Sequence, residues 1–186
     1  MSLASLARLG ADHGALGWYA DARHKACVLA LALDQCSDYT IDVLAILSPR
    51  VPVARNLSMT ADYLSGVCPS QLPTVPSVKR SLANYEKDGR VRGSKVRRFA
   101  DAIRGNTSAV VVDTWILQAL GYDPPSSDLQ YRRIAAHIQE LSYRLKRIDA
   151  RHERWTPRDT QAAVWTGYQL SLGRTPALFP DPMEIL

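Results

Sequence analysis

Lysine, arginine and glycine residues are concentrated in one short part of the sequence, between residues 79 and 104. The basic side chains there are Lys79, Arg80, Lys87, Arg90, Arg92, Lys95, Arg97, Arg98 and Arg104. Only Glu86, Asp88 and Asp101 oppose them, and the surplus of six exceeds the net charge of +5 of the whole chain. Clustered cations attract polyanions and supply the salt-dependent part of their affinity. The pattern therefore predicts a cationic patch.

Two glycines, Gly89 and Gly93, lie inside this basic stretch. Glycine lets a backbone approach a phosphate closely, and N–H groups at the start of a helix at Ser94 can bind it with the help of the helix dipole. Such a contact reads no base sequence. The side chains expected to add charge are Arg90, Arg92, Lys95, Arg97 and Arg98. The alternative is a solvated basic face on an amphipathic helix.

Two short helices are expected to position these groups, over about 77–87 and 95–104. Asp88 and Gly89 form a turn pair that ends the first helix, and Ser94 is the expected N-cap of the second. Val96, Phe99 and Ile103 recur at helical spacing and should face a core. The two helices would thus flank a hairpin that carries both glycines.

The rest of the chain also favours helices. Apolar runs at 22–33 and 39–47 predict two buried helices at the centre of the core. Ser48 and Pro49 should stop the second, and Pro52 should lie in the first turn of the next. The run 109–112 predicts an extended buried segment before a helix capped by Asp113 or Thr114. A long helix over 131–148 and a last helix capped by Thr156 should follow, with an irregular tail from Gly173.

These elements predict one all-α domain over residues 1–186, a two-lobed helical bundle with its cleft between the lobes. Cys27, Cys36 and Cys68 are odd in number and lack metal-site spacing, so we expect reduced core thiols. The histidines show no ligand spacing either, so we expect no metal. The start lacks the pattern of a secretion signal and no apolar run could span a membrane, which predicts a soluble cytoplasmic protein.

Three segments together resemble a known family. They are DVLAILSPRVPVARN at 42–56, GRVRGSK at 89–95 and AVVVDTWILQAL at 109–120. In this combination the chain resembles the helix-hairpin-helix DNA glycosylases of the endonuclease III type, over roughly residues 40–120. Its short length is similar to that of compact, phage-associated members of that superfamily, and phage origin would place it in the host cytoplasm.

The resemblance implies double-stranded DNA as partner and a helix-hairpin-helix at about 76–104. It implies Lys95 as the amine that attacks the sugar and Asp113 as the assisting carboxylate, 18 residues apart as in the family. Breaking an N-glycosidic bond builds positive charge on the sugar, which a carboxylate stabilises, and an amine can capture C1′ as a Schiff base. The residues expected to touch DNA are Ser48, Arg50, Asn56, Gly89, Arg90, Arg92, Gly93, Ser94, Arg97 and Arg98.

An enzyme of this kind flips the target base out of the helix, and a pocket for it usually includes an aromatic side chain. The candidates are Trp18, Tyr19, Trp115, Trp155 and Trp165, each of which could equally be core. No four-cysteine cluster follows, so no iron–sulfur or other cofactor is implied.

Two alternatives stay open. The family hairpin reads Leu-Pro-Gly-x-Gly before its lysine, whereas residues 90–94 read Arg-Val-Arg-Gly-Ser. This departure favours a non-catalytic DNA-binding protein. A transferase that acts on hypermodified DNA bases is the other alternative, and the oligomeric state is open.

Overall fold

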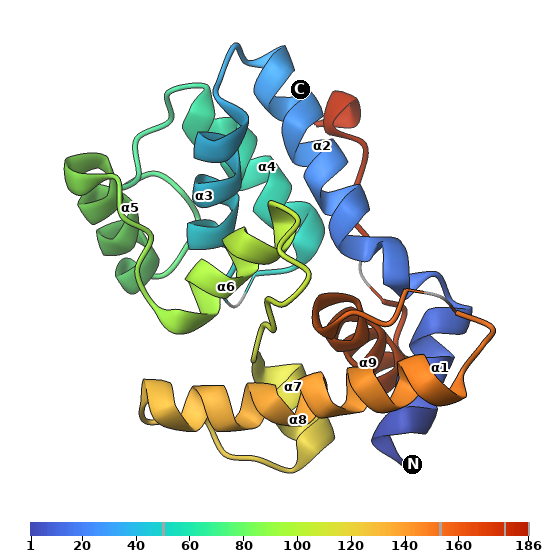
Figure 1. Cartoon of the computed structure of the whole chain (residues 1–186). Helices are drawn as coiled ribbons and strands as arrows, with labels where there is room; N and C mark the ends of the chain where they lie inside the picture. The colour runs from blue at the N-terminus through green and yellow to red at the C-terminus, as the bar shows by residue number, and fades with distance from the viewer. Residues whose placement is uncertain (50, 153, 177, 186) are drawn as a thin grey trace. The chain divides into compact units, whose positions relative to one another are not determined.

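The computed structural model describes every residue of the chain except Arg50, Glu153, Ala177 and Leu186. Across the described residues the regular structure is entirely helical, which confirms the predicted all-α class (Figure 1). The chain divides into two compact units. Unit 1 consists of Met1–Tyr19 and Gly105–Pro176, and unit 2 consists of Ala20–Arg104 and Ala177–Leu186.

Unit 1 is built from helices at the start of the chain and in its last third. They are α1 (Leu3–Asp12), the short 3-10 helix η1 (Ala15–Gly17), α7 (Thr114–Leu120), α8 (Asp128–Ile148) and α9 (Pro157–Ser171). Their apolar faces enclose one core that includes Val112, Ile116, Ile138 and Leu145. The run 109–112 is buried and extended, as predicted, and the Tyr131 hydroxyl accepts from the N–H of Val112 at 2.9 Å. The Tyr131 side chain of α8 thus provides a hydrogen-bond partner for a backbone group that, in a β-sheet, would pair with a neighbouring strand.

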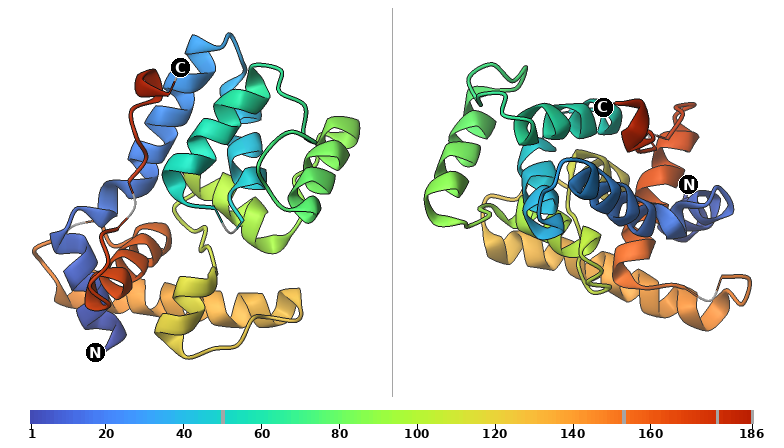
Figure 2. Two further views of the ribbon diagram at one scale, coloured as in Figure 1. Left: turned by 180° about the vertical axis from the view of Figure 1, so that it is seen from behind. Right: turned by 90° about the horizontal axis from the view of Figure 1, so that it is seen from above.

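Helices α1 and α9 lie side by side in unit 1 (Figure 2). Glycines let their backbones approach closely at the crossing. A Cβ atom built on Gly167 would lie 2.7 Å from the Leu6 carbonyl carbon, and one built on Gly10 would lie 2.7 Å from the Ala163 carbonyl carbon. Real Cβ atoms do not approach backbone so closely, so the crossing requires glycine at both positions.

Unit 2 is built around α3 (Ser37–Leu47), which packs on α4 (Val53–Leu64), α5 (Pro76–Asp88) and α6 (Ser94–Ile103). Most of α2 (Trp18–Ala32) and the 3-10 helix η2 (Pro182–Glu184) also belong to it. Leu47, Met59, Leu72 and Leu82 are buried together in its core. The predicted central position is confirmed for α3. It is wrong for α2, whose Leu31 is 84% exposed, because only one face of that helix is covered.

Some local predictions are confirmed and others are wrong. Helix α3 ends at Leu47 before Pro49, as predicted. Pro52 is the N-cap of α4, with an extended ψ of 147°, and not a first-turn residue. The interpretation of the cysteines as core thiols is wrong for Cys36 and Cys68, because both are exposed. For Cys36 the reason is that the run of apolar residues ends before it in the chain.

Neither a metal cluster nor a membrane span is found in the described part of the chain. Among these residues, no group of three or more His, Cys, Asp and Glu side chains is placed to hold a metal ion. No helix among them combines the length and apolar character needed to cross a membrane.

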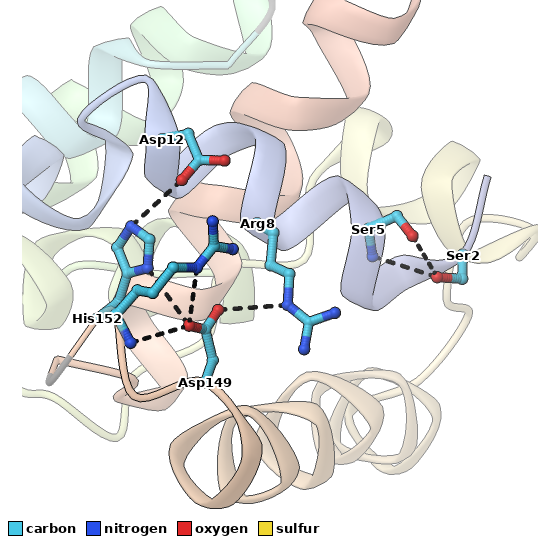
Figure 3. A network of polar contacts seen from close by, with 7 residues as sticks. Ser2, Ser5, Arg8, Asp12, Asp149 and His152 are labelled. Carbon is cyan, nitrogen blue, oxygen red and sulfur yellow. Dashed lines mark hydrogen bonds and ion pairs between the residues drawn. The ribbon is translucent and has the colours of Figure 1, made fainter.

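A polar network in unit 1 centres on Asp149, just after α8 (Figure 3). Its side chain is 2% exposed and lies 3.3 Å from Nε of Arg8 on α1. The N–H of Arg151 donates to it at 3.2 Å, and the ring of His152 lies between it and Asp12. Burial alone would raise the pKa of Asp149, but the Arg151 hydrogen bond, the Arg8 ion pair and the nearby charges outweigh it and lower that pKa.

This lowered pKa predicts acid sensitivity. Since folding depresses the pKa of Asp149, its contribution to stability is complete above the unfolded-state value of about 3.9 and is lost as the pH falls through the lower folded-state value. Asp149→Asn removes that contribution at every pH. The difference in free energy of unfolding between the wild type and Asp149→Asn should therefore shrink from about pH 5 to about pH 2 in urea titrations. Glu140→Gln, an exposed change in the same unit, serves as control, and a difference that is constant with pH would contradict the prediction.

Candidate nucleic-acid interface

The basic stretch of the sequence folds as two helices joined by residues 89–93. Helix α5 begins with Pro76, which suits a first helical position because its missing N–H has no intrahelical partner there. It ends at Gly89, whose φ of 66° is in the left-handed region that favours glycine. Both helices are found within one residue of their predicted bounds.

Asp88 organises the loop between the helices. Its Oδ1 atom accepts from the N–H of Arg90 at 3.0 Å, and its Oδ2 atom pairs with the guanidinium of Arg92. Gly93 has φ 87° and ψ 133° and is the N-cap of α6, so the predicted N-cap at Ser94 is wrong by one residue. The reason is that Gly93, with its positive φ, lies just outside the helix, and Ser94 directly after it is already helical. The first backbone N–H groups of α6, which have no acceptor inside the helix, therefore begin at Ser94.

The cations of this region lie on its outer side. Arg90, Arg92, Arg97 and Arg98 are exposed, whereas Phe99, Ala100 and Ile103 of the same helix are buried. In the described part of the chain no ion pair involves Arg90, Arg97 or Arg98. Lys95 is half-buried. We call residues 89–98 the α6 surface.

Arg104 has a different role from the other basic residues. Its guanidinium lies 2.9 Å from Asp38 and 2.6 Å from Asp42, both on α3. The Tyr85 hydroxyl of α5 donates to the same Asp42 at 2.8 Å. Burial is the main cause that raises the pKa of Tyr85, and this hydrogen bond is the second. Arg104 therefore holds α6 against α3 and α5, and its charge is already compensated.

Three predicted DNA contacts lie in the turn between α3 and α4 and in the first turn of α4. The Ser48 hydroxyl is half-buried and donates to the Ala45 carbonyl at 2.8 Å. Asn56 is 2% exposed, and its Nδ2 donates to the Leu44 carbonyl at 3.1 Å, so it joins α3 to α4. Arg50 lies outside the described residues. Asn56 is not part of the proposed DNA-binding surface, because its side chain is buried.

The two predicted catalytic residues belong to different units, Lys95 to unit 2 and Asp113 to unit 1. Asp113 is the N-cap of α7, as expected, and its Oδ1 accepts from the N–H of Ile116 at 2.9 Å. It is half-buried. The Asp113 carboxylate therefore caps α7.

Asp113 influences a buried tyrosine of the same unit. Burial, together with the nearby Asp113 and Tyr131, raises the pKa of Tyr19 well above its ordinary value, while Arg158 opposes the shift. The Tyr19 hydroxyl donates to Oε1 of Gln161 at 2.6 Å, and the Arg158 guanidinium lies 5.9 Å from its ring centre. Sequence reasoning selected Tyr19 but not Arg158. The only signal for Arg158 was its place in the cap of α9.

The other aromatic candidates pack within unit 1. The rings of Trp18 and Trp165 lie 5.8 Å apart. Trp115 lies under the guanidinium of Arg174, at 4.8 Å, and Trp155 is 3% exposed. Trp155 is therefore a core residue, the alternative that the sequence left open, whereas Trp18, Trp115 and Trp165 are half-buried.

The structure thus defines an all-helical protein of two compact units with an exposed cationic helix–loop–helix. The chain belongs to the protein family described as "Family of unknown function (DUF7178)", whose profile matches residues 7–170 and therefore includes most of both units. No curated protein matches the chain. No solved structure matches it either.

Proposed function

We propose that the protein binds double-stranded DNA through the α6 surface and is a base-excision enzyme of the DNA N-glycosylase type. The observation that carries the proposal is the exposed group of arginines around a loop with two positive-φ glycines, at the start of a helix. A helix N-terminus and guanidinium groups both favour phosphate. Of the predicted contacts, Gly89, Arg90, Arg92, Gly93, Ser94, Arg97 and Arg98 make up the binding surface.

The proposed chemistry uses Asp113 and Lys95. As the base leaves with the electrons of the glycosidic bond, the sugar gains positive charge at C1′, which the Asp113 carboxylate stabilises. Either water or the Lys95 amine then forms the new bond to C1′. Attack by water, with loss of a proton, gives an abasic site. Attack by the amine, also with loss of a proton, gives a C1′–N bond, and cleavage of the sugar C1′–O4′ bond, with a proton taken up by O4′, then opens the ring and gives a Schiff base.

DNA binding is tested by salt titration of the affinity for a duplex. We expect Arg97→Gln with Arg98→Gln to weaken binding about tenfold or more at about 50 mM salt, and to lower the salt slope by about 0.9 for each phosphate that is no longer neutralised. Arg23→Gln with Arg174→Gln removes the same charge from exposed residues outside this surface. Equally weakened binding in both double variants would contradict the proposed surface.

Catalysis is tested by mass spectrometry of duplexes that carry normal, deaminated, oxidised, methylated, hydroxymethylated or glucosylated bases. We expect one base to be released, and Asp113→Asn to abolish release while binding is kept, because asparagine can still cap α7. A heavier base would instead indicate a transferase. Salt-sensitive binding with no change in any duplex would leave the non-catalytic DNA-binding protein favoured by the altered hairpin.

A further inference from the structure

A second group of uncompensated cations lies on α8, in unit 1. One face of this helix is buried in the core through Tyr131, Ile134, Ile138, Leu141 and Leu145. The opposite side carries exposed basic side chains, which are Arg132, Arg133, Arg144, Lys146 and Arg147. We call these five residues the α8 surface. Figure 1 shows α8 as one long helix, so they stand on a single rigid element.

The spacing of three arginines places them in a row along α8. Arg144 and Arg147 follow Arg133 by 11 and 14 residues, which are about three and four turns, so the three share one side of the helix. At about 1.5 Å per residue they extend over roughly 21 Å. Within the described residues no ion pair involves any member of the α8 surface, so its charge is not compensated by the fold.

The chemistry of this face fits a phosphate backbone better than a lipid surface. A helix that binds a membrane inserts an apolar face, and the apolar face of α8 is already buried in unit 1. The large apolar side chains that α8 exposes are Leu129, Tyr143 and Ile148, which are separated along the helix by charges. Four of the five cations are arginines, whose planar guanidinium groups bind phosphate oxygens in pairs.

We propose that the α8 surface is a second site for the DNA backbone, additional to the α6 surface and on the other unit. This inference rests on duplex DNA being the partner of the proposed function. The contacts are to phosphates, so they add affinity and salt dependence without reading base sequence.

One acidic residue allows a test by gain of binding. Glu140 is exposed and follows Arg133 by seven residues, about two turns, so it lies on the same side of α8. Its carboxylate would face the phosphates of a bound duplex and repel them. Glu140→Gln should therefore tighten binding about threefold or more at about 50 mM salt, an outcome that a damaged fold cannot produce.

The weakening of binding is measured on the full chain with Arg144→Gln and Arg147→Gln combined. We expect affinity for duplex DNA to fall about tenfold or more relative to the Arg23→Gln, Arg174→Gln control, and the salt slope to decrease by about 0.9 for each phosphate that is no longer neutralised. A decrease in affinity no greater than in the control, or no gain from Glu140→Gln, would overturn the α8 surface.

The two proposals fail separately in this design. If only the α6 variant weakens binding, the proposed function stands and the α8 surface is overturned. If only the α8 variant does, the α8 surface stands and the proposed α6 surface fails. Absence of any duplex binding by the wild type overturns both. Binding of anionic phospholipid vesicles that depends on α8, with DNA binding unchanged, would assign the surface to a membrane and also overturn it.

Discussion

Gly167→Ala is expected to lower the free energy of unfolding by about 3 kcal/mol or more. In an ordinary helix interior the same change stabilises by roughly 1 kcal/mol, because alanine is the better helix former. Here the added methyl group would lie 2.7 Å from the Leu6 carbonyl carbon and closer still to its oxygen. Backbone cannot rotate away as a side chain can, so α1 and α9 would have to separate and open the core of unit 1.

Urea unfolding of the variant measures this effect, and Gly17→Ala is the matched control. Gly17 belongs to the same unit, and a Cβ atom there meets nothing within 4 Å. That change should be neutral or stabilise by up to about 1 kcal/mol, through the lower entropy of the unfolded chain. A destabilisation by Gly167→Ala no larger than the change in Gly17→Ala would show that the helices are not in close contact.

Asp159→Ala is expected to destabilise the protein by about 3 kcal/mol or more. The Asp159 side chain is 4% exposed, and its Oδ1 lies 2.8 Å from Nε of Arg158, which is 13% exposed. Its Oδ2 accepts from the Thr156 hydroxyl at 2.7 Å, while Thr156 accepts from the N–H of Asp159. Removing the carboxylate therefore leaves a largely buried guanidinium without its counter-charge and weakens the cap of α9.

Two further variants separate these causes in thermal or urea unfolding. Thr156→Ala removes the cap alone and should cost about 1 kcal/mol. Asp123→Ala removes an exposed carboxylate from the loop before α8 and should change the free energy of unfolding by less than about 0.5 kcal/mol, the usual size for a surface substitution. An effect of Asp159→Ala no larger than that of Thr156→Ala would mean that the ion pair with Arg158 contributes nothing to stability.

The boundaries of several helices could be predicted because the signals that set them are local. Thr156 and Pro157 begin α9, Pro49 follows the end of α3, and Gly89 ends α5. Proline, glycine and capping side chains act on the backbone within about one helical turn, so sequence neighbours are sufficient. Helix α1 was not predicted, because its short sequence of small and apolar residues has no start or stop signal other than the N-cap Ser2.

The cationic character of the α6 surface was also predictable, since nine basic residues within 26 positions cannot all be compensated locally. Their individual roles were not. Arg104 looks like its neighbours in the sequence but pairs with Asp38 and Asp42, which come from α3. Asn56 looks like a polar turn residue, yet its side chain is buried against α3.

The sequence by itself determined the helical class, the ends of several helices and the block of positive charge at residues 79–104. Caps, turn residues and apolar periodicity act between near neighbours, and the charges lie close together in the chain. The tertiary structure decided which polar groups are used inside the fold, such as Asp149, Asp159 and Asn56, and which cations stay exposed on α6 and α8. It also decided that Gly10 and Gly167 bring α1 and α9 into contact. The burial of a side chain and the close approach of two helices depend on residues far apart in the chain, and local sequence patterns do not identify those residues.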